Sequence, residues 1–146
     1  MKRYSYIIDK NVTMADVFIR INEKTPEDLF SAAAYAMISV MLENPDSIEG
    51  KETVRIDLHA DEMDILLYDF LGELVYRKDA DGTILLPSSI SFTSRDRPFA
   101  LSAELSGEKI NKQKHMFRVD VKAVTMHRLE VKRMNGDWSC TFVMDV

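Results

Sequence analysis

Asn135-Gly136 lies between two runs of alternating residues near the end of the 146-residue sequence, and it constrains the fold more than any other feature. Asn-Gly favours a two-residue type I′ turn, because both residues tolerate a positive φ and the turn matches the twist of paired strands. We therefore expect residues 128–134 and 138–144 to form an antiparallel hairpin. One face of the second strand carries the side chains of Trp138, Cys140, Phe142 and Met144.

A helix start is predicted at Thr25-Pro26-Glu27-Asp28. Threonine can cap the helix, and proline suits the first helical position. The two acids complement the partial positive charge of a helix N-terminus. The apolar stripe that follows extends this helix to about Glu43.

A second helix is predicted between Asp61 and Lys78, with acids at its start and basic residues at its end. Its apolar face is expected to carry Ile65, Leu66, Phe70, Leu74 and Tyr76. Gly72 falls inside this helix, where glycine costs about 1 kcal/mol relative to alanine, so we expect a packing reason for it.

Alternating runs predict further strands at residues 4–8, 17–21, 53–58, 84–92, 99–105 and 116–124. Two helices among several strands predict an α+β fold, in which the helices pack on a mostly antiparallel or mixed β-sheet. The length predicts a single domain over residues 1–146, and it leaves room for a small inserted lobe.

Composition excludes several classes of protein. The sequence has 19 Lys and Arg against 24 Asp and Glu, which argues against nucleic-acid binding by phosphate neutralisation alone. Hydrophobic residues make up 46%, too many for a disordered chain. No apolar run reaches membrane-spanning length, and the N-terminus does not resemble a secretory signal. We expect a soluble cytoplasmic protein without a membrane partner.

Cysteine and glycine motifs narrow the possible chemistry further. A single cysteine, Cys140, excludes a disulfide framework and a cysteine-based zinc site, and its alternation with apolar residues predicts a buried thiol. The glycine-rich motifs of nucleotide-binding loops and of hydrolase nucleophile elbows are absent. The sequence therefore does not predict a self-sufficient nucleotide-hydrolysing site.

Carboxylates near the end of the sequence are a candidate metal site. Asp145 is followed by Val146, whose α-carboxylate lies one residue away, and two such groups can chelate a hard divalent cation. Asp16, where a loop enters a predicted strand, is a candidate third ligand. The alternative is a loose terminal residue and an ordinary loop acid. Because chain ends are usually loose, the residues alone favour this alternative.

Lys122 is a candidate contact for phosphate or for an acidic partner. Alternation along the predicted strand 116–124 places it on one face with Asp120 and Val124. The alternative is a solvated or ion-paired strand lysine, which the residues alone favour because exposed lysines are common.

The three histidines have no spacing typical of metal ligands on one helix. Structural or surface roles are expected for His59, His115 and His127. Lys109, Lys112 and Lys114 surround His115, and we expect them to form a solvated hairpin tip.

Several motifs in combination resemble the archease family, small proteins that activate the GTP-dependent tRNA-splicing ligase. The matching residues are Thr13-Met14-Ala15-Asp16, the helix segment 66–74, Gly107-Glu108 followed by His115, the block 121–127, and Asp145-Val146. The resemblance covers nearly the whole length. Three positions depart from the family pattern: Thr13-Met14 replaces His-Thr, and Met126 replaces Tyr.

The resemblance implies a function that the residues alone do not. In the family, the residues that correspond to Asp16, Asp145 and Val146 bind a divalent metal, which here could be calcium, magnesium or manganese. Lys122 corresponds to a lysine implicated in activation. The chain would then be a protein cofactor of the tRNA-splicing RNA ligase, not an enzyme. It would promote guanylylation of the ligase by GTP and multiple turnover, and it would broaden nucleotide use.

Such a cofactor does not need to bind nucleic acid directly. Two alternatives remain open. One is a general chaperone or modulator of RNA-modifying enzymes. The other is a metal-dependent phosphoryl-transfer enzyme that acts alone.

Overall fold

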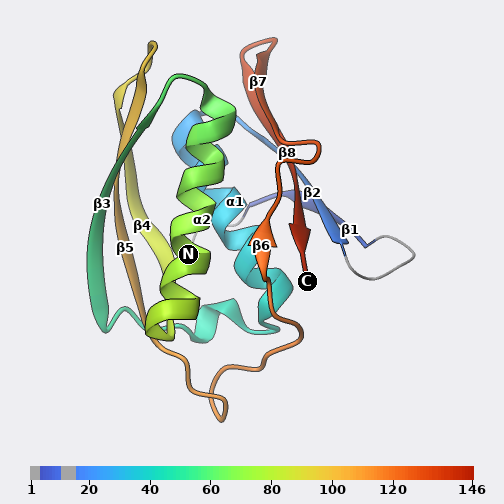
Figure 1. The fold of residues 1–146 in the computed structure, drawn as a ribbon, viewed down its shortest axis with the longest axis vertical. Coiled ribbons are helices and arrows are strands. Elements are labelled where there is room, and N and C mark those ends of the chain that lie inside the picture. The colour runs from blue at the N-terminus through green and yellow to red at the C-terminus, as the bar shows by residue number, and fades with distance from the viewer. Residues whose placement is uncertain (1–3, 11–15) are drawn as a thin grey trace.

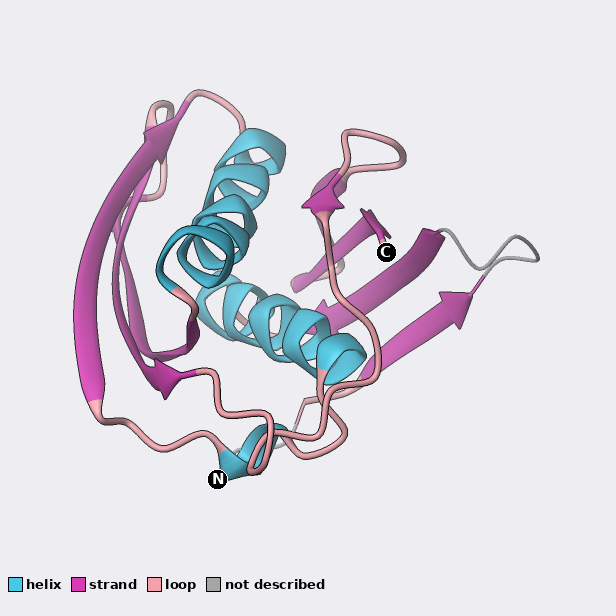
Figure 2. Cartoon of the chain, turned by 60° about the horizontal axis from the view of Figure 1, so that its bottom comes forward, coloured by secondary structure: helices cyan, strands magenta, loops and turns pink. Residues whose placement is uncertain are grey.

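The computed structural model describes residues 4–10 and 16–146, and its two helices lie between two antiparallel sheets (Figures 1 and 2). The five-stranded sheet contains β1 (Tyr6–Lys10), β2 (Asp16–Glu23), β8 (Asp137–Asp145), β6 (Ala123–Val124) and β7 (Glu130–Met134). The three-stranded sheet has the order β3 (Glu52–Ala60), β5 (Phe99–Lys109) and β4 (Thr83–Ser94). The helices are α1 (Pro26–Met41) and α2 (Met63–Asp81), with a short 3₁₀ turn at Pro45–Ser47. The predicted α+β class is confirmed, with the strands divided between two sheets.

The first helix begins as its sequence predicts. The Thr25 side chain accepts a hydrogen bond from the Asp28 backbone N–H at 3.1 Å, and Pro26 occupies the first helical position. Both sheets contact α1, so its small residues are completely buried. These are Ala32, Ala33, Ala34 and Ala36. Alanine permits this close approach, because nothing longer than a methyl group has to fit between helix and sheet.

The Asn135-Gly136 hairpin is also confirmed. Both residues have positive φ, 55° and 82°, and Met134 pairs with Asp137 across the turn. On β8 the predicted apolar face is buried except at Trp138, which is half-buried, and Phe142 and Met144 have no exposed surface.

The predicted apolar face of the second helix was partly wrong. Tyr76 is 62% exposed and Ile65 is 36% exposed. The residues that form the buried stripe are spaced i, i+3 and i+4 along the helix, and these two lie outside it. That stripe consists of Leu66, Leu67, Phe70, Leu71, Leu74 and Val75. The helix continues past Lys78 to Asp81 and stops at Gly82, whose φ of +64° suits a helix C-cap. The packing reason expected for Gly72 is absent, since a Cβ there would meet nothing within 4 Å.

The predicted strand at 116–124 is mostly a loop. Only Ala123–Val124 pairs in a sheet, and residues 110–122 cross the ends of the helices instead of forming a hairpin tip (Figure 1). Backbone bonds to the end of α1 replace sheet pairing: the Arg118 N–H donates to the Met41 carbonyl at 2.7 Å. Lys122 and Val124 therefore do not share a face, since Lys122 is exposed and Val124 is buried.

Among the described residues, no helix combines the length and the apolar character needed to cross a lipid bilayer.

Two glycines provide a matched test of this packing. At Gly107 a Cβ would lie 1.7 Å from the Ile84 carbonyl oxygen, so Gly107→Ala has to displace a strand. We expect this substitution to lower the free energy of unfolding by about 1–3 kcal/mol or more, the usual cost of forcing an extra carbon atom into a packed core. Gly72→Ala is expected to raise the free energy of unfolding by about 0.5–1 kcal/mol, because alanine has less conformational freedom than glycine in the unfolded chain. Urea unfolding measures both, and a tolerated Gly107→Ala would contradict the β4–β5 packing.

Candidate functional site

The register between β2 and β8 places Asp16 directly opposite Asp145. Their strand neighbours Val17 and Met144 are buried, and alternation therefore directs the two carboxylates to the outer face of the sheet. Directly opposed residues have Cβ atoms about 4.5–5.5 Å apart, which brings both side chains within reach of one ligand. Two residues separated by 129 positions in the sequence thus become neighbours.

Lys122 reaches the same end of β8. Its backbone N–H donates to the Asp145 carbonyl at 2.8 Å, and Ala123 pairs with Asp145 across from β2. The Lys122 side chain is exposed, and it forms no ion pair with the side chains that the structure describes. Val146 follows Asp145 and packs partly against the core. The four residues singled out by sequence therefore converge.

The donor chemistry of this group suits a hard divalent cation. Carboxylates directly opposed across a strand pair repel each other, and a cation between them removes that repulsion. In the described part of the chain, no group of three His, Cys, Asp or Glu side chains lies close enough to hold a metal ion. A third oxygen would have to come from elsewhere, such as the Val146 carboxylate. The metal site stays a prediction, and Thr13-Met14 lies outside the described residues.

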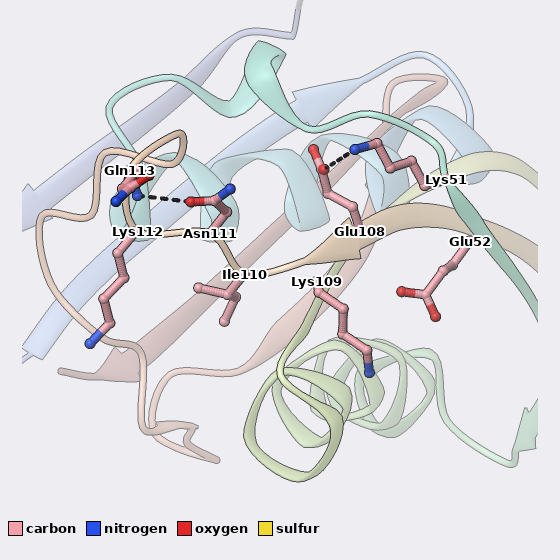
Figure 3. Close-up of a pocket in the computed structure, with 8 residues that line it drawn as sticks. All are labelled: Lys51, Glu52, Glu108, Lys109, Ile110, Asn111, Lys112 and Gln113. Atoms are coloured by element: carbon pink, nitrogen blue, oxygen red, sulfur yellow. Dashed lines mark hydrogen bonds and ion pairs between the residues drawn. The ribbon is translucent and has the colours of Figure 1, made fainter.

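A buried carboxylate at the end of β5 anchors the loop that leads to Lys122 (Figure 3). Glu108 is 5% exposed and accepts from Lys114 Nζ at 2.6 Å and from the Glu49 N–H at 2.7 Å. His115 Nε2 lies 3.2 Å from the same carboxylate. Because the Asn111 N–H donates to Nδ1 at 3.0 Å, Nε2 carries the imidazole proton and donates it to Glu108.

Glu108 also lines a hollow of about 570 Å³, together with Lys51, Glu52 and residues 109–113. Lys51 lies 3.5 Å from Glu108 and closes the hollow on one side (Figure 3). The pKa of Glu108 is lowered from 4.5 to about 2. The hydrogen bond from the Lys114 side chain is the largest cause, and that from the Glu49 backbone N–H is the second. Burial opposes the shift. The carboxylate is therefore ionised at neutral pH, and its charge holds the loop.

Further bonds fix the loop along its length. The Asn44 side chain bonds to the Lys114 carbonyl at 3.2 Å and to the Met116 N–H at 3.0 Å. Lys78, itself buried, donates to Asp120 at 2.7 Å. Burial opposes the charge of Lys78, but its bonds to carboxylates raise its pKa overall. Lys122 thus follows a segment that is hydrogen-bonded along its length.

Sequence reasoning missed this anchoring role of Glu108. The sequence signal for this role is Gly107-Glu108 followed by His115, one of the motifs shared with the archease family. Cys140 is a buried thiol as predicted. Burial raises its pKa to about 12, which keeps it protonated and unreactive.

Glu108→Gln tests the anchor through pH. The pKa of Glu108 is lower in the folded protein than its usual 4.5, so the ionised side chain stabilises the fold above pH 4.5. This stabilisation is lost as the pH falls from 4.5 towards 2. We expect the variant to be less stable than wild type at pH 7, and the difference should shrink below pH 4.5. Urea unfolding at several pH values measures it.

Glu104→Gln is the matched control, because Glu104 is exposed on the same strand and lies outside the cluster. A stability difference between wild type and Glu108→Gln that stays constant from neutral pH to pH 3 would contradict the charged anchor.

Comparison with known proteins gives a consistent result. The profile of the archease protein family matches residues 7–146. The protein archease of Pyrococcus furiosus is 32% identical over 133 residues, covering 90% of this chain and 93% of that protein. The protein archease of Methanopyrus kandleri is 30% identical over 132 residues, covering 90% and 94%.

Solved structures agree with the fold. The solution structure of Methanobacterium thermoautotrophicum protein 1598 matches with a TM-score of 0.81 at 26% identity, covering 97% of this chain and 98% of that one. A Thermotoga maritima crystal structure, described as an archease and possible chaperone, shares the fold with a TM-score of 0.63 at 17% identity, covering 100% and 98%. The profile match over nearly the whole chain, together with these relatives, shows that the chain belongs to the archease family.

Proposed function

We propose that this chain is a protein cofactor of a tRNA-splicing RNA ligase. It promotes guanylylation of the ligase's active-site histidine by GTP, which supports multiple turnover and broader nucleotide use. The observation that carries the proposal is the convergence of Asp16, Asp145 and Lys122 at one end of β8. Membership of the archease family supports the same function, because the motifs that carry the resemblance include these residues.

In this proposal a divalent cation (calcium, magnesium or manganese) is held by the side chains of Asp16 and Asp145 and by the Val146 carboxylate. A bound cation would supply positive charge close to the phosphates of the ligase's nucleotide. The side chain of Lys122 is exposed beside this group, so it can pair with phosphate oxygens or with an acidic side chain of the ligase. The loop anchored by Glu108 limits the positions that Lys122 can take.

Two other functions would show different behaviour in experiments with the purified protein. A general chaperone of RNA-modifying enzymes would bind several unrelated partners, and the Thermotoga maritima relative is described as a possible chaperone. A phosphoryl-transfer enzyme would hydrolyse GTP or RNA without any partner. We rank the ligase cofactor first, because the family motifs include both the carboxylates and Lys122. The stand-alone enzyme ranks low, because the sequence has no glycine-rich motif that would bind phosphates.

The direct test adds substoichiometric protein to the cognate ligase with GTP and a divalent metal. We expect wild type to accelerate guanylylation, and Asp145→Asn or Lys122→Ala to reduce this acceleration about 10- to 100-fold, the range seen when groups around a metal site are removed. Radiolabelled guanylate attached to the ligase provides the measurement.

Asp57→Asn is the matched control, because Asp57 is 67% exposed on β3 in the other sheet. Full activation by Asp145→Asn and by Lys122→Ala would contradict the proposal. Hydrolysis of GTP by the purified chain alone would instead favour the enzyme alternative.

Metal binding has a separate readout that needs no ligase. Manganese or calcium at about 100 times the dissociation constant should raise the free energy of unfolding by about 2.7 kcal/mol. Asp16→Asn and Asp145→Asn should lose this stabilisation, whereas Asp57→Asn should keep it. Urea unfolding with metal and with chelator measures the effect, and equal stabilisation of all three variants would place the ion elsewhere.

A further inference from the structure

Two arginines flank one phenylalanine on the outer face of the five-stranded sheet. Phe18 lies two residues along β2 from Asp16, on the same face. The Arg128 guanidinium lies 4.3 Å from the centre of the Phe18 ring, and that of Arg20 lies 5.6 Å from it. An arginine held at an aromatic ring keeps most of its N–H groups free to donate in the plane of the guanidinium.

The backbone of Arg128 is held in an unusual conformation. Its φ is +55°, a region that side chains other than glycine, asparagine and aspartate seldom adopt. The Thr141 hydroxyl donates to the Arg128 carbonyl at 2.7 Å and fixes this turn. A strained residue kept in place by a specific bond often belongs to a functional site.

The two arginines, Arg20 and Arg128, are not paired with acidic side chains of the described residues. The acidic Glu130 beside them already pairs with Lys132 at 3.3 Å. The Ser139 hydroxyl, which lies on the same face, has no hydrogen bond within residues 4–10 and 16–146. Two guanidinium groups and one hydroxyl are therefore available as donors.

These groups surround a depression of about 470 Å³, which is large enough for a small ligand. Its lining residues include Arg20, Arg128, Glu130, Lys132, Ser139 and Thr141. One carboxylate would neutralise only one of the two unpaired arginines, whereas an oligophosphate neutralises both. Guanidinium also matches phosphate oxygens with two parallel hydrogen bonds.

We propose that this depression binds the phosphate chain of an oligophosphate, either inorganic pyrophosphate or a nucleoside triphosphate. Arg20 and Arg128 hold the phosphate oxygens, and Ser139 donates one further bond. The depression is distinct from the acidic pair, because Arg20 lies four residues, or about 13 Å, along β2 from Asp16. The proposal does not depend on activation of a ligase.

Calorimetric titration of the purified chain with pyrophosphate and with GTP tests it. Chelator is present throughout, so that metal at Asp16 and Asp145 cannot bridge to the ligand. We expect saturable binding with one site, and we expect Arg20→Gln and Arg128→Gln each to weaken it about tenfold, as the loss of one charged hydrogen-bonding group does. Arg128→Lys should weaken it as well, because lysine keeps the charge but lacks the paired donors.

Arg55→Gln is the matched control, because Arg55 is 71% exposed on β3 in the other sheet. Equal affinities for pyrophosphate and GTP would support recognition of the phosphate chain alone, and tighter binding of GTP would support recognition of a nucleoside triphosphate. No saturable binding, or undiminished binding by both Arg20→Gln and Arg128→Gln, would overturn the proposal. So would equal competition by a polyglutamate peptide, which would identify an acidic protein surface as the ligand.

Discussion

The register between β2 and β8 is the constraint on which the site depends. Val17 faces Met144 and Ile19 faces Phe142 across these strands, and all four side chains are buried against the helices. A shift of one residue would turn these apolar side chains to solvent and bury charged ones, so hydrophobic burial fixes the register strongly. The same register necessarily sets Asp16 opposite Asp145. The position of the acidic pair is thus a consequence of core packing.

A second constraint brings Lys122 to that pair. The 13 residues between β5 and β6 form no regular structure, and loops of this length are usually functional or disordered. Here the buried Glu108, together with His115 and Lys114, secures one end, and Lys78 secures Asp120 near the other. Charged hydrogen bonds add to the burial of Val121 in holding the loop, so its geometry is sensitive to the ionisation of Glu108.

Features determined by neighbouring residues were predictable from sequence. The Asn135-Gly136 turn and the Thr25 cap depend on local backbone preferences, and both form as expected. The loop at 110–122 was not predictable, because its alternating residues bond to the end of α1, about 75 positions away in the sequence. Spacing alone also disfavoured the acidic pair, and only the family resemblance selected it. The Arg20, Phe18 and Arg128 group was missed because it depends on a left-handed backbone at Arg128.

We propose that Asp16, Asp145 and the Val146 carboxylate hold one divalent cation beside Lys122. Substoichiometric Mn²⁺ broadens the amide resonances nearest to it, so its position can be read from nuclear magnetic resonance spectra of the isolated chain. We expect broadening centred on residues 16, 122–123 and 145–146, which disappears in Asp145→Asn. Broadening centred on Glu49 and Glu108, or spread evenly over all acidic residues, would contradict it.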